Sequence, residues 1–216
     1  GGADGAALVV VLLPPLGCEG LGFGYVGGGH FWFNEIQLLG AHNVANALAA
    51  IAVALLCECP ISAIRKAVGS YKGREHALEV VRTRKGITFV NDSKGTNVDA
   101  TVKALESFTQ PVVIILGGQD KGSTNFLQLS PVMEKRVKLI IAYGEAGREI
   151  KHQLEAEFQV NYHDKFDEAV IQAHEQSQPG DTILLSPACA SFDQFSNYEE
   201  RGNEFTKIFT KLELGI

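Results

Sequence analysis

From residue 77 onward, short runs of β-branched and aliphatic residues alternate with longer amphipathic segments in this 216-residue chain. The apolar runs predict strands at residues 78–83, 87–90, 111–116, 137–142, 158–162 and 182–185. The segments between and after them predict helices at residues 98–108, 126–134, 146–157, 166–176 and 197–212. Arg84-Lys85-Gly86 separates the first two strands, which indicates a hairpin.

Regular alternation of strands and helices favours right-handed crossovers and parallel strand pairing. We therefore predict an α/β fold: a Rossmann-like, mostly parallel sheet with helices on both faces and an antiparallel hairpin at one edge. Ligands of such sheets bind beyond the carboxyl ends of the strands, so the segments that follow the strands are the first place to look for a site.

The chain before residue 77 is less regular. Residues 6–13 form a short apolar run that predicts a buried strand, and the aromatic residues 30–33 predict another strand. Residues 43–57 are alanine-rich and apolar nearly all round, which predicts a buried helix. A second, more amphipathic helix is expected at residues 62–68.

Glycines bound residues 69–73, where the irregular part of the chain meets the regular part. We expect a hinge there and two domains, residues 1–72 and residues 73–216. The chain begins with Gly1-Gly2, and its only methionine is Met133. This predicts that the chain is a piece of a longer protein.

Charge and composition exclude some classes of function. A net charge of −6 and a pI near 5.5 argue against nucleic acid as a partner, because phosphate-binding surfaces need a dominant basic stripe. The apolar runs are shorter than the roughly 18 residues that a membrane helix needs. Without metal-ligand spacing, the cysteines predict buried, reduced thiols and no metal site; they are Cys18, Cys57, Cys59 and Cys189. We expect a cytoplasmic monomer.

The polar turn at residues 91–97 reads Asn-Asp-Ser-Lys-Gly-Thr-Asn and lies between a predicted strand and a predicted helix. Such a turn directs backbone N–H groups and the positive end of a helix dipole at its ligand, which favours an anion. Thr96 or Asn97 can cap the helix, with Asp99 completing a Thr-x-x-Asp box. A lysine is not needed to cap a helix N-terminus, so the presence of Lys94 favours a binding function for this turn.

Two further strand ends are unusual. Residues 117–122 read Gly-Gly-Gln-Asp-Lys-Gly, where the glycines allow close backbone approach and Lys121 supplies a charge. A flexible turn with a solvated lysine explains that segment equally well. Residues 186–195 are mostly small, and Ser191 can bond a carboxylate. Neither Ser191 nor Cys189 has an evident histidine partner, which disfavours covalent catalysis.

Residues 42–46, His-Asn-Val-Ala-Asn, open the first predicted helix. Asn43 and Asn46 are three residues apart and so share a helix face, and side-chain amides match the donor and acceptor pair of an adenine edge. Alternatively, Asn43 caps the helix and Asn46 is satisfied internally. The residues alone leave both interpretations open.

These segments together resemble the Mur ligase family, in its D-glutamate-adding branch. The resemblance spans about residues 30–212 and rests on five motifs, at residues 42–50, 91–97, 117–121, 186–195 and 201–205. It implies an ATP-dependent amide ligase of peptidoglycan biosynthesis, which adds D-glutamate to UDP-N-acetylmuramoyl-L-alanine through an acyl phosphate, with magnesium. It also implies three domains in the whole enzyme. This chain would then hold the end of the central ATPase domain and the entire C-terminal, amino-acid-binding domain.

The resemblance also implies residue roles. Asn43 and Asn46 would contact the adenine and Asp92 the ribose, while Lys94 would act on the phosphate and carboxylate region. Lys94 and Asp92 are thus the implied catalytic positions. D-Glutamate would be held by Thr96, Lys121, Ser191, Phe192 and Tyr198.

The sequence departs from the family pattern in two places. It contains no Gly-x-x-x-x-Gly-Lys-Ser/Thr phosphate loop and lacks the magnesium-binding part of the central domain. The metal ligands are therefore expected outside this chain, and the isolated chain is predicted to be inactive. The second departure is Ala77, which stands where the family has an arginine; Arg74 lies three residues earlier.

Two other functions compete. One is a non-catalytic domain that binds D-glutamate or a partner, which the missing phosphate loop favours. The other is a nicotinamide-binding Rossmann domain. It fails because no Gly-x-Gly-x-x-Gly follows a strand and precedes a helix, and Gly22-x-Gly24 lacks suitable flanks.

Overall fold

A computed structural model of the protein describes residues 22–24, 30–32, 36, 38–120 and 122–214. The chain forms two compact units, Gly1–Gly73 and Arg74–Ile216. Among the described residues, no helix is both long enough and apolar enough to cross a membrane.

The first unit contains a short antiparallel pair and two helices. Strand β1 (Gly22–Gly24) pairs with β2 (His30–Trp32), which confirms a strand at the aromatic segment. Helix α1 (Ala41–Leu56) and helix α2 (Ile61–Ser70) confirm the two predicted helices. Helix α2 continues to Ser70, two residues into the predicted hinge. The strand predicted at residues 6–13 lies outside the described residues.

The prediction that α1 is buried on all sides is wrong. Among its described side chains only Ile51 is buried, while Val53 and Leu56 are 60% and 77% exposed. The helix packs against α2 along one stripe, where Ile51 meets Ile64. An apolar composition shows that a helix can be buried, but it does not determine how many neighbours the helix has.

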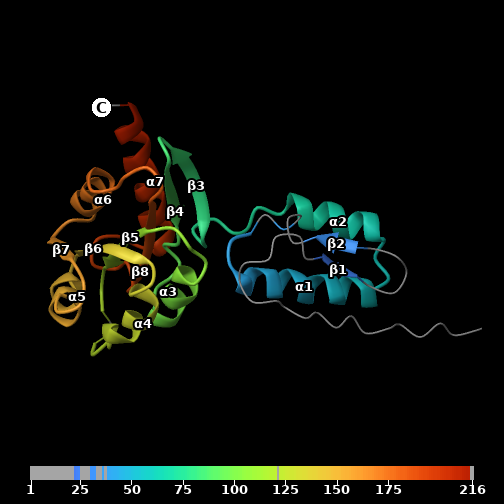
Figure 1. Ribbon diagram of the computed structural model, residues 1–216, viewed down its shortest axis with the longest axis horizontal. Coiled ribbons are helices and arrows are strands. Elements are labelled where there is room, and N and C mark those ends of the chain that lie inside the picture. The colour runs from blue at the N-terminus through green and yellow to red at the C-terminus, as the bar shows by residue number, and fades with distance from the viewer. Residues whose placement is uncertain (1–21, 25–29, 33–35, 37, 121, 215–216) are drawn as a thin grey trace, which may run out of the picture. The chain divides into compact units, whose positions relative to one another are not determined.

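The second unit is built on a six-stranded sheet in the order β3-β4-β8-β5-β6-β7 (Figure 1). The hairpin of β3 and β4 is antiparallel and the other neighbours are parallel, so the predicted fold class is confirmed. Lys85 and Gly86 both have positive φ in the hairpin turn. The strands are β3 (Glu79–Arg84), β4 (Ile87–Asn91), β5 (Val112–Gly117), β6 (Val137–Tyr143), β7 (Val160–His163) and β8 (Thr182–Ala188).

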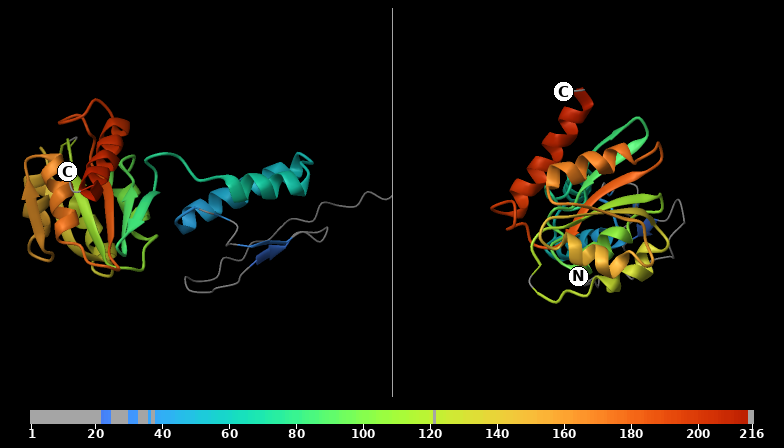
Figure 2. Two further views of the ribbon diagram at one scale, coloured as in Figure 1. Left: turned by 90° about the horizontal axis from the view of Figure 1, so that it is seen from above. Right: turned by 90° about the vertical axis from the view of Figure 1, so that its left-hand side faces the viewer.

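Helices cover both faces of this sheet, as the views in Figure 1 and Figure 2 show. Helices α6 (Phe166–Glu175) and α7 (Tyr198–Leu214) pack on one face, in a core that includes Phe89 and Phe205. Helices α3 (Val98–Leu105) and α5 (Gly147–Leu154) pack on the other. The helix predicted at residues 126–134 is a 3₁₀ turn, η2 (Phe126–Leu129), followed by the single-turn helix α4 (Ser130–Met133).

The position of β8 determines where a ligand can bind. It is the last strand in the chain, yet it lies between β4 and β5. The chain leaves β4 and β5 towards the face that carries α3, and it leaves β8 towards α7 on the opposite face. Strand ends whose connections diverge in this way open a crevice at the carboxyl edge of the sheet, where α/β proteins bind ligands.

Candidate functional site

A fully buried arginine ties three strand ends together. Arg201 on α7 is 0% exposed and donates from Nε to Ser93 Oγ (2.9 Å) and from Nη2 to the Ser93 carbonyl (2.8 Å) after β4. From Nη1 it donates to Tyr143 Oη at the end of β6 (3.2 Å) and to the carbonyls of Cys189 and Ala190 after β8 (3.2 and 3.3 Å). One guanidinium therefore fixes the relative positions of three loops.

Sequence reasoning assigned no role to Arg201, although a signal was available. Residues 201, 205 and 208 are spaced i, i+4, i+7, so Arg201 lies on the same helix stripe as Phe205 and Ile208, both buried. An arginine on the apolar stripe of a helix needs buried acceptors, and here the strand ends supply them.

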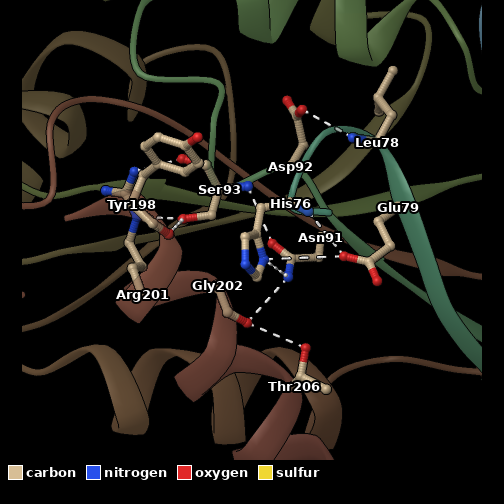
Figure 3. Close-up of polar contacts among 10 residues, drawn as sticks. All are labelled: His76, Leu78, Glu79, Asn91, Asp92, Ser93, Tyr198, Arg201, Gly202 and Thr206. Carbon is tan, nitrogen blue, oxygen red and sulfur yellow. Dashed lines mark hydrogen bonds and ion pairs between the residues drawn. The ribbon is translucent and has the colours of Figure 1, made fainter. Parts of the chain in front are cut away.

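A second buried network joins the segment before β3 to β4 and α7 (Figure 3). Asn91 Nδ2 donates to the Gly202 carbonyl (3.1 Å) and to His76 Nδ1 (2.9 Å), so the imidazole proton is on Nε2. A Cβ at Gly202 would lie 2.4 Å from His76 Nδ1, so the ring needs glycine there. Asn91 and Ser93, both within the predicted anion turn, are thus turned inward and hold the scaffold.

Asp92 also lies at the end of β4, and its carboxylate accepts two hydrogen bonds from within the protein. It is 7% exposed; Oδ1 accepts from Leu78 N (3.1 Å) and Oδ2 accepts from Ser186 Oγ (2.7 Å). Burial raises the pKa of Asp92 from 3.8 to about 6, against the hydrogen bonds from Ser186 and Leu78 and the positive charges of Lys94 and Arg201, which lower it. The result is a carboxyl group that titrates just below neutral pH.

The rest of the β4 turn carries the exposed Lys94 and Asn97. Lys94 is exposed, while its backbone N–H donates to the His76 carbonyl (3.0 Å), so the turn is anchored and the ammonium group is left outside. Asn97 is the N-cap of α3 and accepts from Ala100 N (2.8 Å), which confirms one of the two predicted caps. Thr96 is half-buried beside it. An exposed cation at a helix N-terminus is suited to an anionic ligand.

The glycines at the end of β5, Gly117 and Gly118, allow the sheet to pack closely there. Gly117 and Gly118 have φ of 139° and 122°. A Cβ on Gly117 would lie 2.0 Å from the Tyr143 carbonyl oxygen, and one on Gly118 would lie 2.2 Å from the Ala190 carbonyl oxygen. They therefore let neighbouring strand ends approach each other, and the expectation that they also let a ligand approach stays a prediction. Lys121 lies outside the described residues.

The β8 loop brings the remaining candidates to this edge. Ser191 is buried and its carbonyl accepts from Phe195 N (2.9 Å), while Phe192 is 64% exposed. The Tyr198 carbonyl accepts from Ser93 Oγ (2.7 Å), and its half-buried ring lies edge-on to His76 with centroids 6.4 Å apart. Phe192 therefore offers an exposed ring directly after the buried Ser191 in the chain.

The cysteines differ from their prediction. Cys57 and Cys59 are exposed, so their predicted burial is wrong: they lie at and beyond the end of α1, where the helix gives way to a turn. Cys189 is buried as expected, and burial raises the pKa of its thiol to about 12. A thiol with that pKa is not a nucleophile at neutral pH. Cys18 lies outside the described residues.

The predicted adenine contacts belong to the first unit. Asn43 is half-buried and donates from Nδ2 to the Leu39 carbonyl (2.8 Å), whereas Asn46 is exposed. The N-cap of α1 is Gly40, which makes no side-chain cap. The alternative in which Asn43 caps the helix and Asn46 is satisfied internally is therefore wrong.

A hollow of about 520 Å³ lies near the carboxyl ends of β6 and β7, next to the β8 loop. The Arg148 guanidinium lies 5.5 Å from the Tyr162 ring centroid and 3.7 Å from Asp164 Oδ1 in its wall. No described site residue predicted from the sequence lines it. Nor, within the described ranges, is any group of three or more His, Cys, Asp or Glu side chains placed to hold a metal ion.

Comparison with known proteins identifies the family. The family model described as "Mur ligase, glutamate ligase domain" matches residues 77–189, just over half of the chain. The chain belongs to the Mur ligase family. The motifs that carried the resemblance at the ends of β4, β5 and β8 lie in or immediately beside this match.

Curated Mur ligases are similar over most of the chain. A protein of Koribacter versatilis named UDP-N-acetylmuramoylalanine--D-glutamate ligase is 44% identical over 178 residues, which are 82% of this chain and 39% of the relative. A protein of the same name from Acidobacterium capsulatum is 46% identical over 175 residues, 81% of this chain and 38% of the relative. The chain thus spans about two fifths of the length of these Mur ligases.

Solved Mur ligase structures share the fold. UDP-N-acetylmuramate-alanine ligase MurC from Thermotoga maritima matches with a TM-score of 0.63 and 16% identity, over 88% of this chain and 42% of its own. MurF from Acinetobacter baumannii also matches with a TM-score of 0.63 and 16% identity, over 86% of this chain and 42% of its own. At this identity the likeness supports the architecture alone.

Proposed function

We propose that this chain is part of an ATP-dependent ligase that adds D-glutamate to UDP-N-acetylmuramoyl-L-alanine in cytoplasmic peptidoglycan biosynthesis. The observation that carries this proposal is the convergence of the β4 and β8 loops at Arg201. These loops bring an exposed lysine, a partly occupied carboxylate and an exposed aromatic ring to one edge of the sheet. They do so in a chain 44% identical to a D-glutamate ligase.

The two units would have different tasks. Residues 1–72 would be the end of the central ATPase domain, in which Asn43 and Asn46 contact the adenine of ATP. Residues 73–216 would be the amino-acid-binding domain. The exposed amide of Asn46 is available to a ligand, whereas the Asn43 amide would share its donor with the Leu39 carbonyl.

In the second unit, the β4 turn would receive the nucleotide and the activated carboxylate. Asp92 would accept hydrogen bonds from ribose hydroxyls, since a carboxylate has about four acceptor sites and two are occupied internally. Lys94 would stabilise charge on the phosphate and acyl-phosphate oxygens. D-Glutamate would be held by Thr96, Lys121, Ser191, Phe192 and Tyr198.

ATP supplies the phosphoryl group: its γ-phosphate moves to the substrate carboxylate and ADP leaves. The D-glutamate amine then attacks the acyl phosphate, so that the amide C–N bond forms, the C–O bond to phosphate breaks and the amine loses a proton. This chain's own contribution would be to hold the amine donor and to stabilise developing negative charge. Magnesium would be bound by residues outside this chain.

The proposal is tested by a chimera. The C-terminal segment of the Koribacter versatilis ligase that matches this chain would be replaced by the corresponding residues of this chain, which are 44% identical to it. We expect the chimera to release phosphate from ATP only when both D-glutamate and UDP-N-acetylmuramoyl-L-alanine are present. A folded chimera that accepts neither substrate, or that prefers another amino acid, would contradict the proposal.

Variants of the chimera separate the two lysines. Lys121→Ala should mainly raise the KM for D-glutamate, by roughly tenfold to a hundredfold, because it removes a charge-assisted bond to a carboxylate. Lys94→Ala should lower kcat more than it raises that KM. Lys207→Ala, a change of an exposed residue on α7, is the matched control and should leave both constants unchanged.

The isolated 216-residue chain should show no phosphate release that depends on D-glutamate, since its sequence contains no phosphate loop. It should still bind D-glutamate, with NMR shift changes at Thr96, Ser191 and Phe192 that L-glutamate does not reproduce. Binding without any activity in the chimera would instead favour a non-catalytic D-glutamate-binding domain.

A further inference from the structure

A buried network of hydrogen bonds around Asp92 links β8 and α3 to the segments just before β3 and just after β4. Ser186 on β8 donates from Oγ to Asp92 Oδ2 (2.7 Å), and Ser186 Oγ lies 3.2 Å from Thr101 Oγ1 on α3. Leu78 N, just before β3, donates to Asp92 Oδ1 (3.1 Å). Ser186 and Thr101 are both 0% exposed, so water does not compete for these bonds.

The direction of the hydrogen bonds follows from the distances. The Ser186 hydroxyl has a single proton, and the carboxylate at 2.7 Å is a closer and stronger acceptor than the Thr101 hydroxyl at 3.2 Å. Thr101 then donates its own proton to the Ser186 carbonyl (3.2 Å) or the Asn97 carbonyl (3.3 Å). Thr101 thus contacts both oxygens of Ser186, and the Ser186 hydroxyl in turn holds Asp92.

We propose that Ser186, supported by Thr101, is a positioning residue that fixes the orientation of the Asp92 carboxylate. The lone pairs of Asp92 that accept no internal hydrogen bond then point to a ligand. The nature of that ligand, a nucleotide ribose, rests on the proposed function. Ser186 approaches from β8 and Leu78 from the β3 side, so each carboxylate oxygen is held by one internal donor. A carboxylate held at both oxygens has one orientation.

The same contact controls the charge of Asp92. Burial favours the protonated form, which accepts hydrogen bonds less well, and the Ser186 hydroxyl opposes it. The charged groups that act on this carboxyl are Lys94 from its own turn and Arg201 from α7. Ser186 and Thr101, which approach from β8 and α3, are uncharged. Removing the Ser186 hydroxyl should therefore raise the pKa of Asp92 further.

The test follows the titration of the Asp92 carboxyl by carbon-13 NMR in the 216-residue chain, with the signal assigned by its loss in Asp92→Asn. The test variants are Ser186→Ala and Thr101→Val. The matched controls are Ser107→Ala and Thr210→Val, whose hydroxyls also donate to backbone carbonyls four residues earlier and have no contact with Asp92.

We expect the titration midpoint of Ser186→Ala to lie about one pH unit above that of the parent, roughly a tenfold change in the protonation equilibrium. Thr101→Val should move it in the same direction by less, and the controls should not move it. A Ser186→Ala midpoint equal to the parent's, or equal shifts in the controls, would overturn the proposal. If Ser186→Ala does not fold, Thr101→Val is the test: a raised midpoint supports the proposal, and a midpoint equal to the parent's overturns it.

A kinetic measurement separates positioning from a purely structural role. In the chimera, Ser186→Ala should raise the KM for ATP more at pH 6.5 than at pH 8.5, because protonated Asp92 is the weaker acceptor. An equal change at both pH values would overturn the positioning role. The NMR titration needs no nucleotide, so an inactive chimera would count against the proposed ligase while the titration still decides the role of Ser186.

Discussion

At the scale of single residues, the burial of the charged Asp92 carboxylate lowers the free energy of unfolding near neutral pH. Its pKa is about 6 in the folded protein and 3.8 without burial, so the folded state binds more protons between these two values. The contribution of Asp92 to the free energy of unfolding then falls by about 3 kcal/mol in all as pH rises from about 4 to above 6. A stability cost of this kind is common at functional sites.

Asp92→Asn should therefore stabilise the second unit near neutral pH, by about 1 to 3 kcal/mol. The asparagine Oδ1 can accept from Leu78 N and its Nδ2 can donate to Ser186 Oγ, so neither bond is left unmade. Urea unfolding followed by NMR signals of β5 should show a gain that vanishes below pH 4. The exposed change Asp99→Asn is the control, and a loss of stability in Asp92→Asn at pH 7 would refute the prediction.

The three described cysteines should differ in reactivity. Iodoacetamide at pH 8 should modify Cys57 and Cys59 within minutes in the native chain, because both are exposed. Cys189 should remain unmodified until the protein is unfolded, since it is buried and its pKa is raised to about 12. Mass spectrometry of peptides measures each site separately. Equal labelling of Cys189 in the native protein would contradict its burial.

At the scale of elements, α7 holds together the loops of the candidate site. Its buried stripe carries Arg201 to the strand ends and Phe205 to the core of the sheet. The Tyr198 carbonyl and Gly202 add contacts to the β4 side. The geometry of the β4 and β8 loops thus depends on the docking of one helix.

Arg201→Met should destabilise the second unit by about 3 to 5 kcal/mol, because buried oxygens of Ser93, Tyr143, Cys189 and Ala190 lose their donor together. Urea unfolding reports this change. Lys207→Met on the same helix is the control, since Lys207 is exposed and pairs with Glu204 at the surface. If Arg201→Met were as stable as the parent protein, Arg201 would not be the residue that holds the loops together.

At the scale of the whole molecule, the second unit has a hydrophobic core of its own. Its buried core includes residues of β4, β5, β6 and β8 and of helices α6 and α7, all within Arg74–Ile216. Among the described residues of this unit, the antiparallel edge of the sheet is the β3–β4 hairpin, which is closed by Lys85 and Gly86 in a left-handed turn.

Residues 74–216 expressed alone should therefore fold. We expect the amide shifts of β4, β5, β6 and β8 in a proton–nitrogen NMR spectrum to match those of the full chain, because their core lies in this unit. Residues 1–73, with a smaller core centred on Ile51 and Ile64, are the comparison and should show poorer dispersion. A collapsed spectrum for residues 74–216 would contradict the division into units.

The local sequence determined the elements and much of the site's location. Periodicity and turn residues depend on neighbours along the chain, and so the hairpin, the parallel strands, the Asn97 cap and the polar turn after β4 could be predicted. The same patterns failed for α1, whose apolar composition carries no information about how many elements surround it.

Only the tertiary structure decided what these residues contact. Ser93 and Arg201 are 108 residues apart, and Asp92 and Ser186 are 94 apart. Their contacts exist because β8 inserts between β4 and β5, a strand order that no local pattern encodes. The same insertion brings Gly118 against the Ala190 carbonyl and buries Asp92. Charge state and orientation at the site depend on burial and on distant donors, and these arise only when the sheet is assembled.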